Sequence, residues 1–257
     1  MAGPACIGGE RDLSERELAH LPGWRSSRPV RVGNGAWQQR QLDIYGELLD
    51  SAARLPELLA GVEPETKRFL AGAWDRVRGW EQAREDMAAA IRGQGWSDAA
   101  NAYTQAFGSA ELDASSLLLC IAGFLPADDP RMLATIDAVD RHLTDDRGLV
   151  YRDRAADGLP GEEGTFLLCT FWLAQALALA GQTERARTIF DRAAGFATDL
   201  GLLAEEVSAD GRELLGNFPQ AFSHIGLVNA AWAIASAEQN GKNSEQNGEN
   251  SEQKGRE

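Results

Sequence analysis

The sequence predicts an all-α fold in which helices of two kinds alternate around a ring, an α/α toroid. The first observation is that apolar residues recur at helical spacing over most of the 257-residue chain. The second is that helices apolar on nearly every face, such as 162–181, are followed by helices with one charged face, such as 182–201. A helix apolar all round is covered on all sides, whereas a striped helix has one face in water. The two kinds in turn therefore build an inner ring of buried helices inside an outer ring.

Composition limits the class of partner. The chain is 44% hydrophobic, enough for a full core, and its formal net charge is −14. This charge repels phosphate backbones and anionic lipid, so we expect no nucleic-acid or membrane partner and favour a neutral ligand such as a sugar. We see no apolar stretch of 18 residues and no leader peptide, and therefore expect a cytoplasmic protein.

Neither the cysteines nor the histidines indicate a metal or cofactor site. The cysteines have no paired or metal-like spacing, and two of them lie in apolar helical runs, where a thiol behaves as a small hydrophobe. The histidines are scattered along the chain. The residues concerned are Cys6, Cys120, Cys169, His20, His142 and His224. We expect no metal and no cofactor.

The chain divides into three parts. Residues 1–34 carry glycine, proline and serine punctuation and are predicted to be an irregular lead-in. Residues 35–238 hold the helices. Residues 239–257 are polar and cannot bury enough apolar surface to offset chain entropy, so a disordered tail is predicted.

Within the middle part, a helix from residue 35 is followed by amphipathic helices at 64–78 and 80–92. A unit of loop, apolar helix and charged helix then repeats over 102–143 and 148–201, and a third copy at 201–239 stops after its apolar helix. Asp128 and Asp129 before Pro130 predict a helix cap, and Gly181 predicts a helix end.

The loops that enter inner helices lie at one end of such a ring, so three loops converge on one mouth. They carry aromatic rings, an arginine and several carboxylates. Rings stack on apolar sugar faces, charged groups bind vicinal hydroxyls, and paired carboxylates hydrolyse acetals. The loop residues are Tyr103, Gln105 and Phe107 in the first loop, Tyr151, Arg152, Asp153, Glu162 and Glu163 in the second, and Glu205 and Glu206 in the third.

Several motifs resemble the C-terminal part of the catalytic domain of glycoside hydrolase family 15, which includes glucoamylases, glucodextranases and trehalases. They are GNGAWQQRQLDIYGELLD, GSAELDASSLLL, GFLPADDPRM, GLPGEEGTFLLCTFWLAQALALAG and LLAEEV…LLGNFPQAFSHIGLVNAA. The resemblance implies an (α/α)6 barrel, hydrolysis of terminal α-glucosidic bonds with inversion, and no metal in the chemistry. The chain is then an incomplete (α/α)6 toroid, with four inner and four outer helices in place of six of each.

The resemblance also implies site residues. Glu205 matches the position of the family's general base, and Glu206 is given a supporting or solvated role. Arg152, Glu162 and Glu163 resemble a sugar-clamping loop. Phe166, expected on the first turn of the next helix, lines the neighbouring subsite or packs in the core, and both readings stay open. The ligand implied is a small α-glucoside or an oligosaccharide.

The family's general-acid segment, a tryptophan–glutamate pair in a glycine-containing loop followed by an inner helix, is missing. Trp80 and Glu81 are rejected as a replacement because residues 82–91 have the charged stripe of an outer helix. Two outer-type helices in succession, 64–78 and 80–92, indicate that an inner helix is deleted between them. The family's N-terminal sandwich and first helices are also missing.

Two functions remain open. One is an inverting glycoside hydrolase of glucoamylase or trehalase type, whose activity is in doubt because a general acid contributes about two to four orders of magnitude in rate. An open ring exposes the apolar flanks of its end helices, so self-association or a partner chain that completes the toroid is expected. The alternative is a non-catalytic carbohydrate-binding or degenerate remnant of such an enzyme.

Other candidate groups have structural interpretations. Ser223 and His224 are neighbours in a helix and do not face each other, so we predict a packed, hydrogen-bonded histidine rather than a nucleophile pair. The tryptophans at apolar helical positions are predicted to be core residues. They are Trp37, Trp172 and Trp232.

Overall fold

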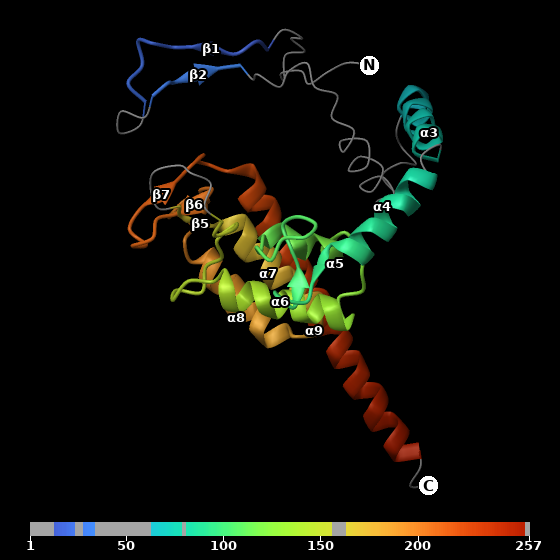
Figure 1. Ribbon diagram of the computed structural model, residues 1–257. Helices are drawn as coiled ribbons and strands as arrows, with labels where there is room; N and C mark the ends of the chain where they lie inside the picture. Colours follow the sequence, from blue (N-terminus) through green and yellow to red (C-terminus); the bar gives the residue numbers. More distant parts are fainter. Residues whose placement is uncertain (1–12, 24–27, 34–62, 79–80, 156–162, 255–257) are drawn as a thin grey trace. The chain divides into compact units, whose positions relative to one another are not determined.

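The computed structural model describes residues 13–23, 28–33, 63–78, 81–155 and 163–254 (Figure 1). The chain forms two compact units, Met1–Asp86 and Met87–Glu257, and each is described by itself. The described residues are mainly helical, with a few two-residue strands, so the expected all-α class is confirmed.

The first unit contains a short hairpin and a helix. Strand β1 (Arg16–Glu17) pairs antiparallel with β2 (Arg31–Val32), an element that the sequence analysis did not predict in the lead-in. Helix α3 (Pro64–Arg78) has the predicted bounds. Its first residue is proline, whose fixed backbone angle suits a helix start. The helix expected from residue 35 lies outside the described residues.

Helix α4 (Glu81–Gln94) crosses the boundary between the units and matches the amphipathic helix predicted at 80–92. The remaining elements belong to the second unit. They are β3 (Trp96–Ser97), β4 (Ala102–Tyr103), the 3-10 helix η2 (Ala114–Leu117), α5 (Leu118–Ile121), α6 (Pro130–His142), β5 (Thr165–Phe166), α7 (Leu167–Leu179), α8 (Thr183–Ala194), β6 (Glu206–Val207), β7 (Leu214–Leu215) and α9 (Ala221–Lys254).

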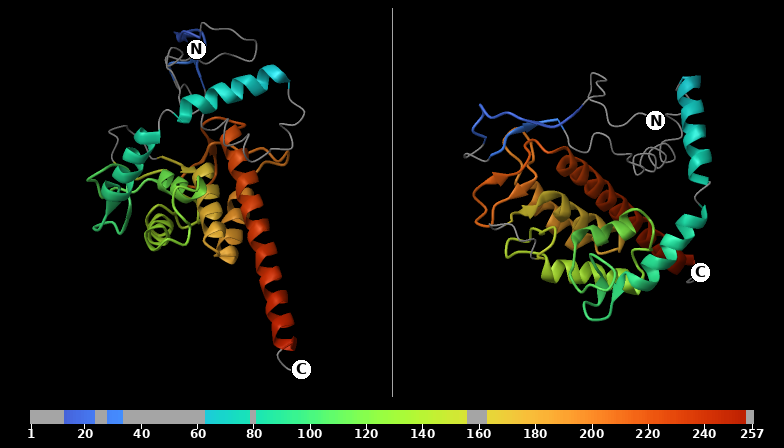
Figure 2. Two further views of the ribbon diagram at one scale, coloured as in Figure 1. Left: turned by 90° about the vertical axis from the view of Figure 1, so that its right-hand side faces the viewer. Right: turned by 45° about the horizontal axis from the view of Figure 1, so that its top comes forward.

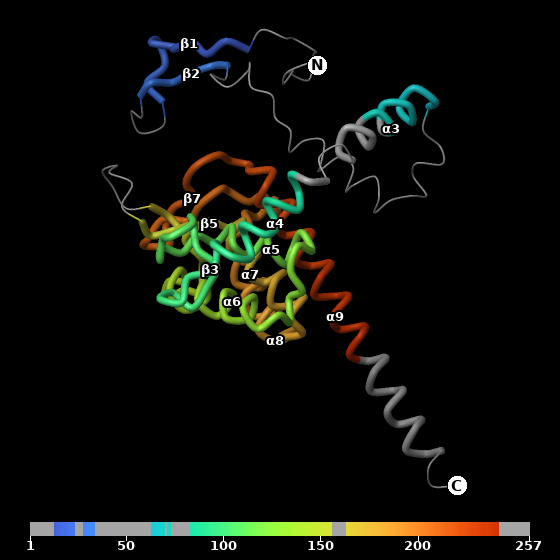
Figure 3. The backbone as a smooth tube through the Cα atoms, turned by 45° about the vertical axis from the view of Figure 1, so that its right-hand side comes forward, coloured from blue at the N-terminus to red at the C-terminus, as the bar shows by residue number. Residues whose placement is uncertain are grey.

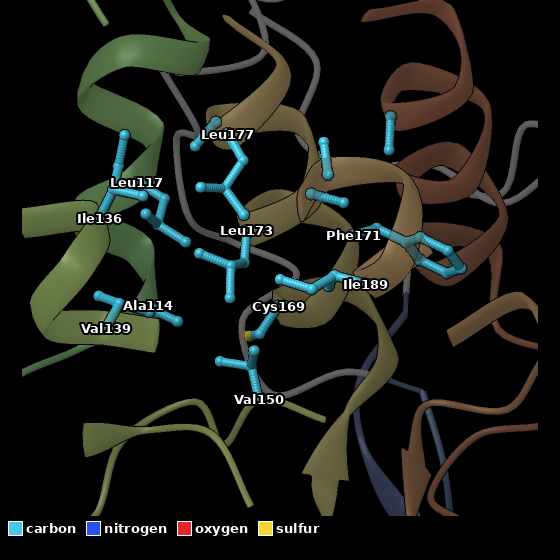
Figure 4. Close-up of a cluster of buried hydrophobic side chains, with 14 of the residues drawn as sticks. Ala114, Leu117, Ile136, Val139, Val150, Cys169, Phe171, Leu173, Leu177 and Ile189 are labelled. Atoms are coloured by element: carbon cyan, nitrogen blue, oxygen red, sulfur yellow. The ribbon is translucent and has the colours of Figure 1, made fainter. Parts of the chain in front are cut away.

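Helix α7 is the centre of the second unit. It packs against α5, α6, α8 and α9 (Figure 2), and most of its residues are buried, as its uniformly apolar sequence predicts. The ring of Phe171 lies 5.7 Å from the ring of Phe190 on α8. Leu173 and Leu177 are buried on another side of α7, toward Leu117 and Ile136 (Figure 4). Helix α8 buries one stripe, so the predicted alternation of a buried and a striped helix is confirmed for this pair.

One predicted inner helix is shorter than expected. The sequence predicts a helix over 111–125, but the structure has η2 and α5 over 114–121 only. Asp113 starts the turn because its side chain accepts a hydrogen bond from Ser115 N. Gly123, at φ +73°, takes the left-handed conformation that ends a helix.

The predicted helix boundaries at Asp129 and Gly181 are confirmed. Asp129 Oδ1 accepts hydrogen bonds from Arg131 N and Met132 N and caps α6. Gly181 has φ +76° just after α7.

A three-stranded antiparallel sheet in the order β5-β6-β7 joins the start of α7 to the segment before α9. Thr165 pairs with Val207, and Glu206 pairs with both Phe166 and Leu215. Figure 3 shows β5 and β7 together beside α7. This sheet determines which residues of the 201–217 segment face the start of α7.

Helix α9 packs against α7 and α8. It continues to Lys254, past residue 238, so the structure draws no boundary there. The three-part division of the chain stays a prediction. Among the described residues no helix is long and apolar enough to span a membrane.

Candidate functional site

A cavity of about 340 Å³ opens where η2, α7 and α9 begin. It collects side chains from five segments that are separated in sequence, 113–115, 152, 166–172, 205 and 220–223. The lining residues are Asp113, Ser115, Arg152, Phe166, Leu168, Cys169, Trp172, Glu205, Gln220, Phe222 and Ser223.

Glu205, the predicted general base, lines this cavity and is half-buried. Its Oε2 atom accepts two hydrogen bonds from Asn217, one from the backbone N–H and one from Nδ2, each at 2.9 Å. Its carbonyl accepts from Leu167 N, the first residue of α7, at 3.1 Å. Both the backbone and the carboxylate of Glu205 are therefore fixed relative to the cavity.

Arg152 lies on the same cavity, and its side chain is mostly exposed. Nε donates to Asp153 Oδ2 at 3.2 Å, and this hydrogen bond is the main reason that the pKa of Arg152 is raised above its ordinary value. The carbonyl of Arg152 accepts from Ala114 N, which ties the loop to η2. The cavity wall thus carries a cation, the guanidinium group of Arg152, whose charge is opposite to that of Glu205.

The other predicted clamp residues are placed differently. Glu163 is exposed and is not among the lining residues of the cavity, although its charge acts on Arg152 and Glu206. Glu162 lies outside the described residues. Of the predicted set, the structure brings Glu205, Arg152 and Phe166 together.

Phe166 was expected on the first turn of the following helix, and this placement is wrong. It lies in β5, directly before α7, because its N–H donates to Val150 O and Phe166 itself pairs with Glu206 of β6. The residue is half-buried and packs against the core, which supports the core reading; it also lines the cavity, and its place in a sugar subsite stays a prediction.

Glu206 is not a fully solvated side chain. It is half-buried, and its Oε2 accepts from Gly164 N at 3.3 Å. Partial burial, followed by the charges of Glu205 and Glu163, raises the pKa of Glu206, while the Gly164 hydrogen bond acts in the opposite direction. Glu206 therefore supports the β5–β6 contact.

Two expectations are wrong, one for the first loop and one for Trp232. Tyr103 is buried in the core against Trp96, with ring centroids 5.5 Å apart, and Gln105 and Phe107 are exposed away from the cavity lining. Trp172, predicted to be core, is half-buried: it packs against the core cluster and also lines the cavity. Trp232, also predicted to be core, is 77% exposed.

The predicted role of Ser223 and His224 is confirmed. Ser223 Oγ donates to Ala204 O at 2.7 Å and is buried. The ring of His224 bonds Gln220 O and accepts from Leu203 N. Both side chains are occupied by backbone groups, so they form no nucleophile pair.

Sequence reasoning missed several lining residues. Asp113 is 8% exposed and is the second residue of the segment LDASSLLL, directly before the helical residues, where a capping signal was available. Gln220 and Phe222, near the start of α9, carry no separate signal because they read as ordinary helix residues. Burial raises the pKa of the Cys169 thiol, so this lining residue stays protonated and supplies no nucleophile.

Comparison with solved structures defines the class of fold. One glycosidase variant superposes with a TM-score of 0.61 at 22% identity, covering 84% of this chain and 74% of that one. A wild-type glycosidase gives 0.53 at 24% identity, with 77% and 53% covered, and a glycosidase variant in complex with glucose gives 0.54 at 21%, with 82% and 54% covered. The chain therefore has a helical fold that is also found in glycosidases.

The family follows from the sequence comparisons. The model described as glycosyl hydrolases family 15 matches residues 5–70 and 66–232. Trehalases of Mycolicibacterium smegmatis and Mycobacterium tuberculosis are 39% and 38% identical to this chain, of which each alignment covers 93%, and they are covered over 43% and 42% of their own lengths. A Thermoplasma volcanium trehalase is 30% identical, with 88% and 44% covered. The chain belongs to glycosyl hydrolases family 15, and it spans less than half the length of these relatives.

The comparisons bear on the predicted internal deletion, which stays a prediction. The two matched ranges meet at residues 66–70, inside α3 and before the point between 78 and 80 where the sequence analysis placed it. The alignment with the M. smegmatis trehalase has 290 positions, although 93% of 257 residues supplies only about 239 of them. In total, about 50 aligned positions thus have no counterpart in this chain.

Proposed function

We propose that this chain carries the water-activating and sugar-holding side of an inverting α-glucosidase site, on part of an (α/α)6 toroid. The observation that carries this proposal is that Glu205 and Arg152, from loops about fifty residues apart, line one cavity. Its volume of about 340 Å³ lies in the range of small-molecule sites and suits one glucosyl unit.

In this proposal Glu205 takes a proton from a water molecule, and the water oxygen attacks the anomeric carbon on the face opposite the leaving group. Arg152 and the buried Asp113 bind sugar hydroxyls, while Trp172 contacts an apolar face of the ring. The bond to the leaving oxygen breaks with its electron pair going to that oxygen.

The leaving oxygen needs a proton that the cavity does not supply. Among the described lining residues the carboxylates are Asp113 and Glu205, and Asp113 Oδ1 is engaged as the cap of η2. Hydrolysis of an ordinary glycoside is therefore proposed to be slower by about two to four orders of magnitude than with a general acid. The trehalases among the relatives favour trehalose as the natural type of bond, with maltose-type bonds as the other candidate.

A substrate whose leaving group needs no proton tests this directly. We expect the wild-type chain to convert α-D-glucosyl fluoride to β-glucose and fluoride, with little or no turnover of trehalose or maltose. Glu205→Gln should lower the rate at least 100-fold, while Glu163→Gln, an exposed carboxylate that does not line the cavity, should leave it within twofold. Release of α-glucose, or equal rates for wild type and Glu205→Gln, contradicts the proposal.

The absence of an acid among the described lining residues favours one other function, a non-catalytic sugar-binding remnant. In that case the fluoride is not hydrolysed, but a glucose-like inhibitor such as 1-deoxynojirimycin still raises the melting temperature. The two measurements together separate the hydrolase from the remnant.

Self-association is proposed through an apolar stripe on α9, defined as Phe222, Ile225, Val228 and Trp232. Each of these side chains is more than half exposed, while α9 buries its opposite face against α7 and α8. We propose that the partner bound at this stripe is a second copy of the chain, because the order of its side chains, aromatic, aliphatic, aliphatic, aromatic, is nearly symmetric about residue 227. A twofold contact requires such a self-complementary surface. The buried thiols of Cys120 and Cys169 suit the proposed cytoplasmic location.

A further inference from the structure

Asn217, a loop residue outside the predicted site, binds Glu205 at three points. Its backbone N–H and its Nδ2 group both donate to Glu205 Oε2 at 2.9 Å, and its carbonyl accepts from Glu205 N at 3.1 Å. If the side-chain amide were turned around, Oδ1 would face Oε2 and two acceptors would repel, so the chemistry selects the donating orientation.

The sheet brings these two residues together. The pairing of Glu206 with Leu215 in β6 and β7 places Gly216 and Asn217 beside Glu205. Gly216 has φ +71°, and a Cβ atom there would lie 2.6 Å from Glu205 Oε2. The backbone of residues 216–217 thus lies against the carboxylate as closely as sterics allow.

The turn that carries this strand pair is itself anchored. Arg147 donates from Nη1 to Ser208 O at 2.8 Å and is held by Asp145, 2.6 Å from Nη2. Ser208 Oγ accepts from Glu213 N at 3.0 Å. The position of Asn217 therefore depends on a hairpin whose turn is anchored by Arg147.

Two of the three hydrogen bonds reach the carboxylate of Glu205, and they leave it asymmetric. Oε2 receives two donors, whereas no described residue donates to Oε1. We propose that Asn217 is a positioning residue that occupies Oε2 and turns Oε1 toward the substrate water. This inference rests on the proposed function, since it concerns the same base.

The step balances as follows. Oε1 takes one proton from water, the freed oxygen pair forms the bond to the anomeric carbon, and the carbon–fluorine bond of the probe breaks with its pair leaving as fluoride. Glu205 then returns its proton to solvent. Because Asn217 contacts the carboxylate and not the neutral substrate, its loss should change kcat rather than KM.

Two variants test the donor. Asn217→Ala removes Nδ2, and Asn217→Asp keeps the shape but replaces the donor by an acceptor. With α-D-glucosyl fluoride we expect both to lower kcat 10- to 100-fold with KM unchanged within twofold, since hydrogen bonds to charged groups have about this value. Ser208→Ala, which weakens the same hairpin without touching Glu205, should leave kcat within threefold.

Binding of 1-deoxynojirimycin, measured by calorimetry, gives a readout independent of turnover. Its ammonium pairs with the positioned carboxylate, so Kd should rise about tenfold or more in Glu205→Gln, Asn217→Ala and Asn217→Asp and stay within twofold in Ser208→Ala. If wild type does not hydrolyse the fluoride but the inhibitor follows this order, hydrolysis fails and the positioning role stands. If both Asn217 variants have the same kcat and Kd as the wild-type protein, the positioning role alone is overturned. If the wild-type protein neither hydrolyses the fluoride nor binds the inhibitor, both proposals are overturned.

Discussion

Gly216 shows how one missing side chain shapes the candidate site. Its positive φ is strained for any other residue, and a Cβ atom would also collide with Glu205 Oε2 and Cβ, at 2.6 and 2.8 Å. Gly201 has a similar φ of +74°, but a Cβ atom there would meet nothing within 4 Å. Substitutions at Gly216 and at Gly201 therefore separate the effect of backbone strain from the effect of displacing the Glu205 carboxylate.

Gly216→Ala should therefore lower the free energy of unfolding by about 1–3 kcal/mol and also reduce fluoride hydrolysis at least tenfold. Gly201→Ala should carry only the backbone strain, about 1–2 kcal/mol, with hydrolysis unchanged. Urea denaturation and the fluoride assay on both variants check this. Equal hydrolysis by the two variants would show that Glu205 tolerates displacement.

Glu206 makes the free energy of unfolding depend on pH, in a direction that follows from its raised pKa. Its folded-state pKa lies above the ordinary value of 4.5, so between these two values the folded chain binds a proton more tightly than the unfolded chain does. The contribution of Glu206 to stability is therefore greatest when it is protonated, and it falls as the pH rises through the raised pKa.

Glu206→Gln keeps an oxygen for the Gly164 hydrogen bond and removes the charge. We expect it to be more stable than wild type at pH 7, with a difference that shrinks as the pH falls below 4.5. Thermal melting between pH 4 and pH 8 measures this, with the exposed Glu111→Gln as the control for net charge. A difference that grows as the pH falls would contradict the assigned sign.

At the scale of elements, α7 should dominate stability. Phe171 is fully buried and lies between Phe190 on α8 and Gly226 on α9, where a Cβ atom would be 3.2 Å from Phe171 Cβ. Phe171→Ala should cost about 3–5 kcal/mol, because the three helices cannot close the space left by the ring. Phe107→Ala, at an exposed ring, should cost less than about 0.5 kcal/mol. Urea denaturation of both variants measures these losses, from the unfolding midpoints compared at equal slope of the unfolding free energy against urea concentration.

The helices were predictable because their signals are local. Helices 64–78, α6 and α8 have a 3.6-residue period, whereas α7 is apolar on all sides, and each has a proline near its start or a glycine at its end. The structure places these helices at the expected positions, although α8 ends at Ala194 and not at the predicted residue 201. The inner helix expected at 111–125 failed because apolar residues continue beyond Gly123, where the backbone turns away. The helical spacing of apolar residues alone does not reveal the end of the helix at Gly123.

The contacts of the site were only partly predictable. The resemblance identified Glu205 and Arg152, which share the cavity, but not Asn217 or Asp113. Two-residue strands such as β6 and β7 are too short to show alternation, so nothing local indicates that residue 217 meets residue 205. Trp232 was misplaced for a similar reason, because an apolar residue at helical spacing has the same pattern whether or not another element covers it.

At the scale of the whole molecule, the stripe on α9 predicts association. Two copies related by a twofold axis would place Phe222 against the second copy's Trp232, and Ile225 near its Val228. The stripe offers on the order of 500 Å² per copy, so a pair buries about 1,000 Å², the lower end for a specific interface. Such an area indicates a weak dimer.

Trp232→Glu should therefore raise the dimer dissociation constant more than tenfold in sedimentation velocity over a micromolar concentration series. Leu200→Glu is a matched control, because Leu200 is 78% exposed against 77% for Trp232 but lies outside the stripe. A wild type that stays monomeric throughout, or equal constants for the two variants, would mean that the stripe does not join two copies.

The walls of the cavity all come from residues 113–223, and the break in the family match lies upstream, at 66–70. Under the proposed function, the residues that activate water and hold the sugar are therefore encoded downstream of the point where the two matched ranges meet. A deletion at that upstream point would leave the walls of the cavity in place. Turnover would then require only a proton donor supplied by another chain, or a substrate whose leaving group needs no proton.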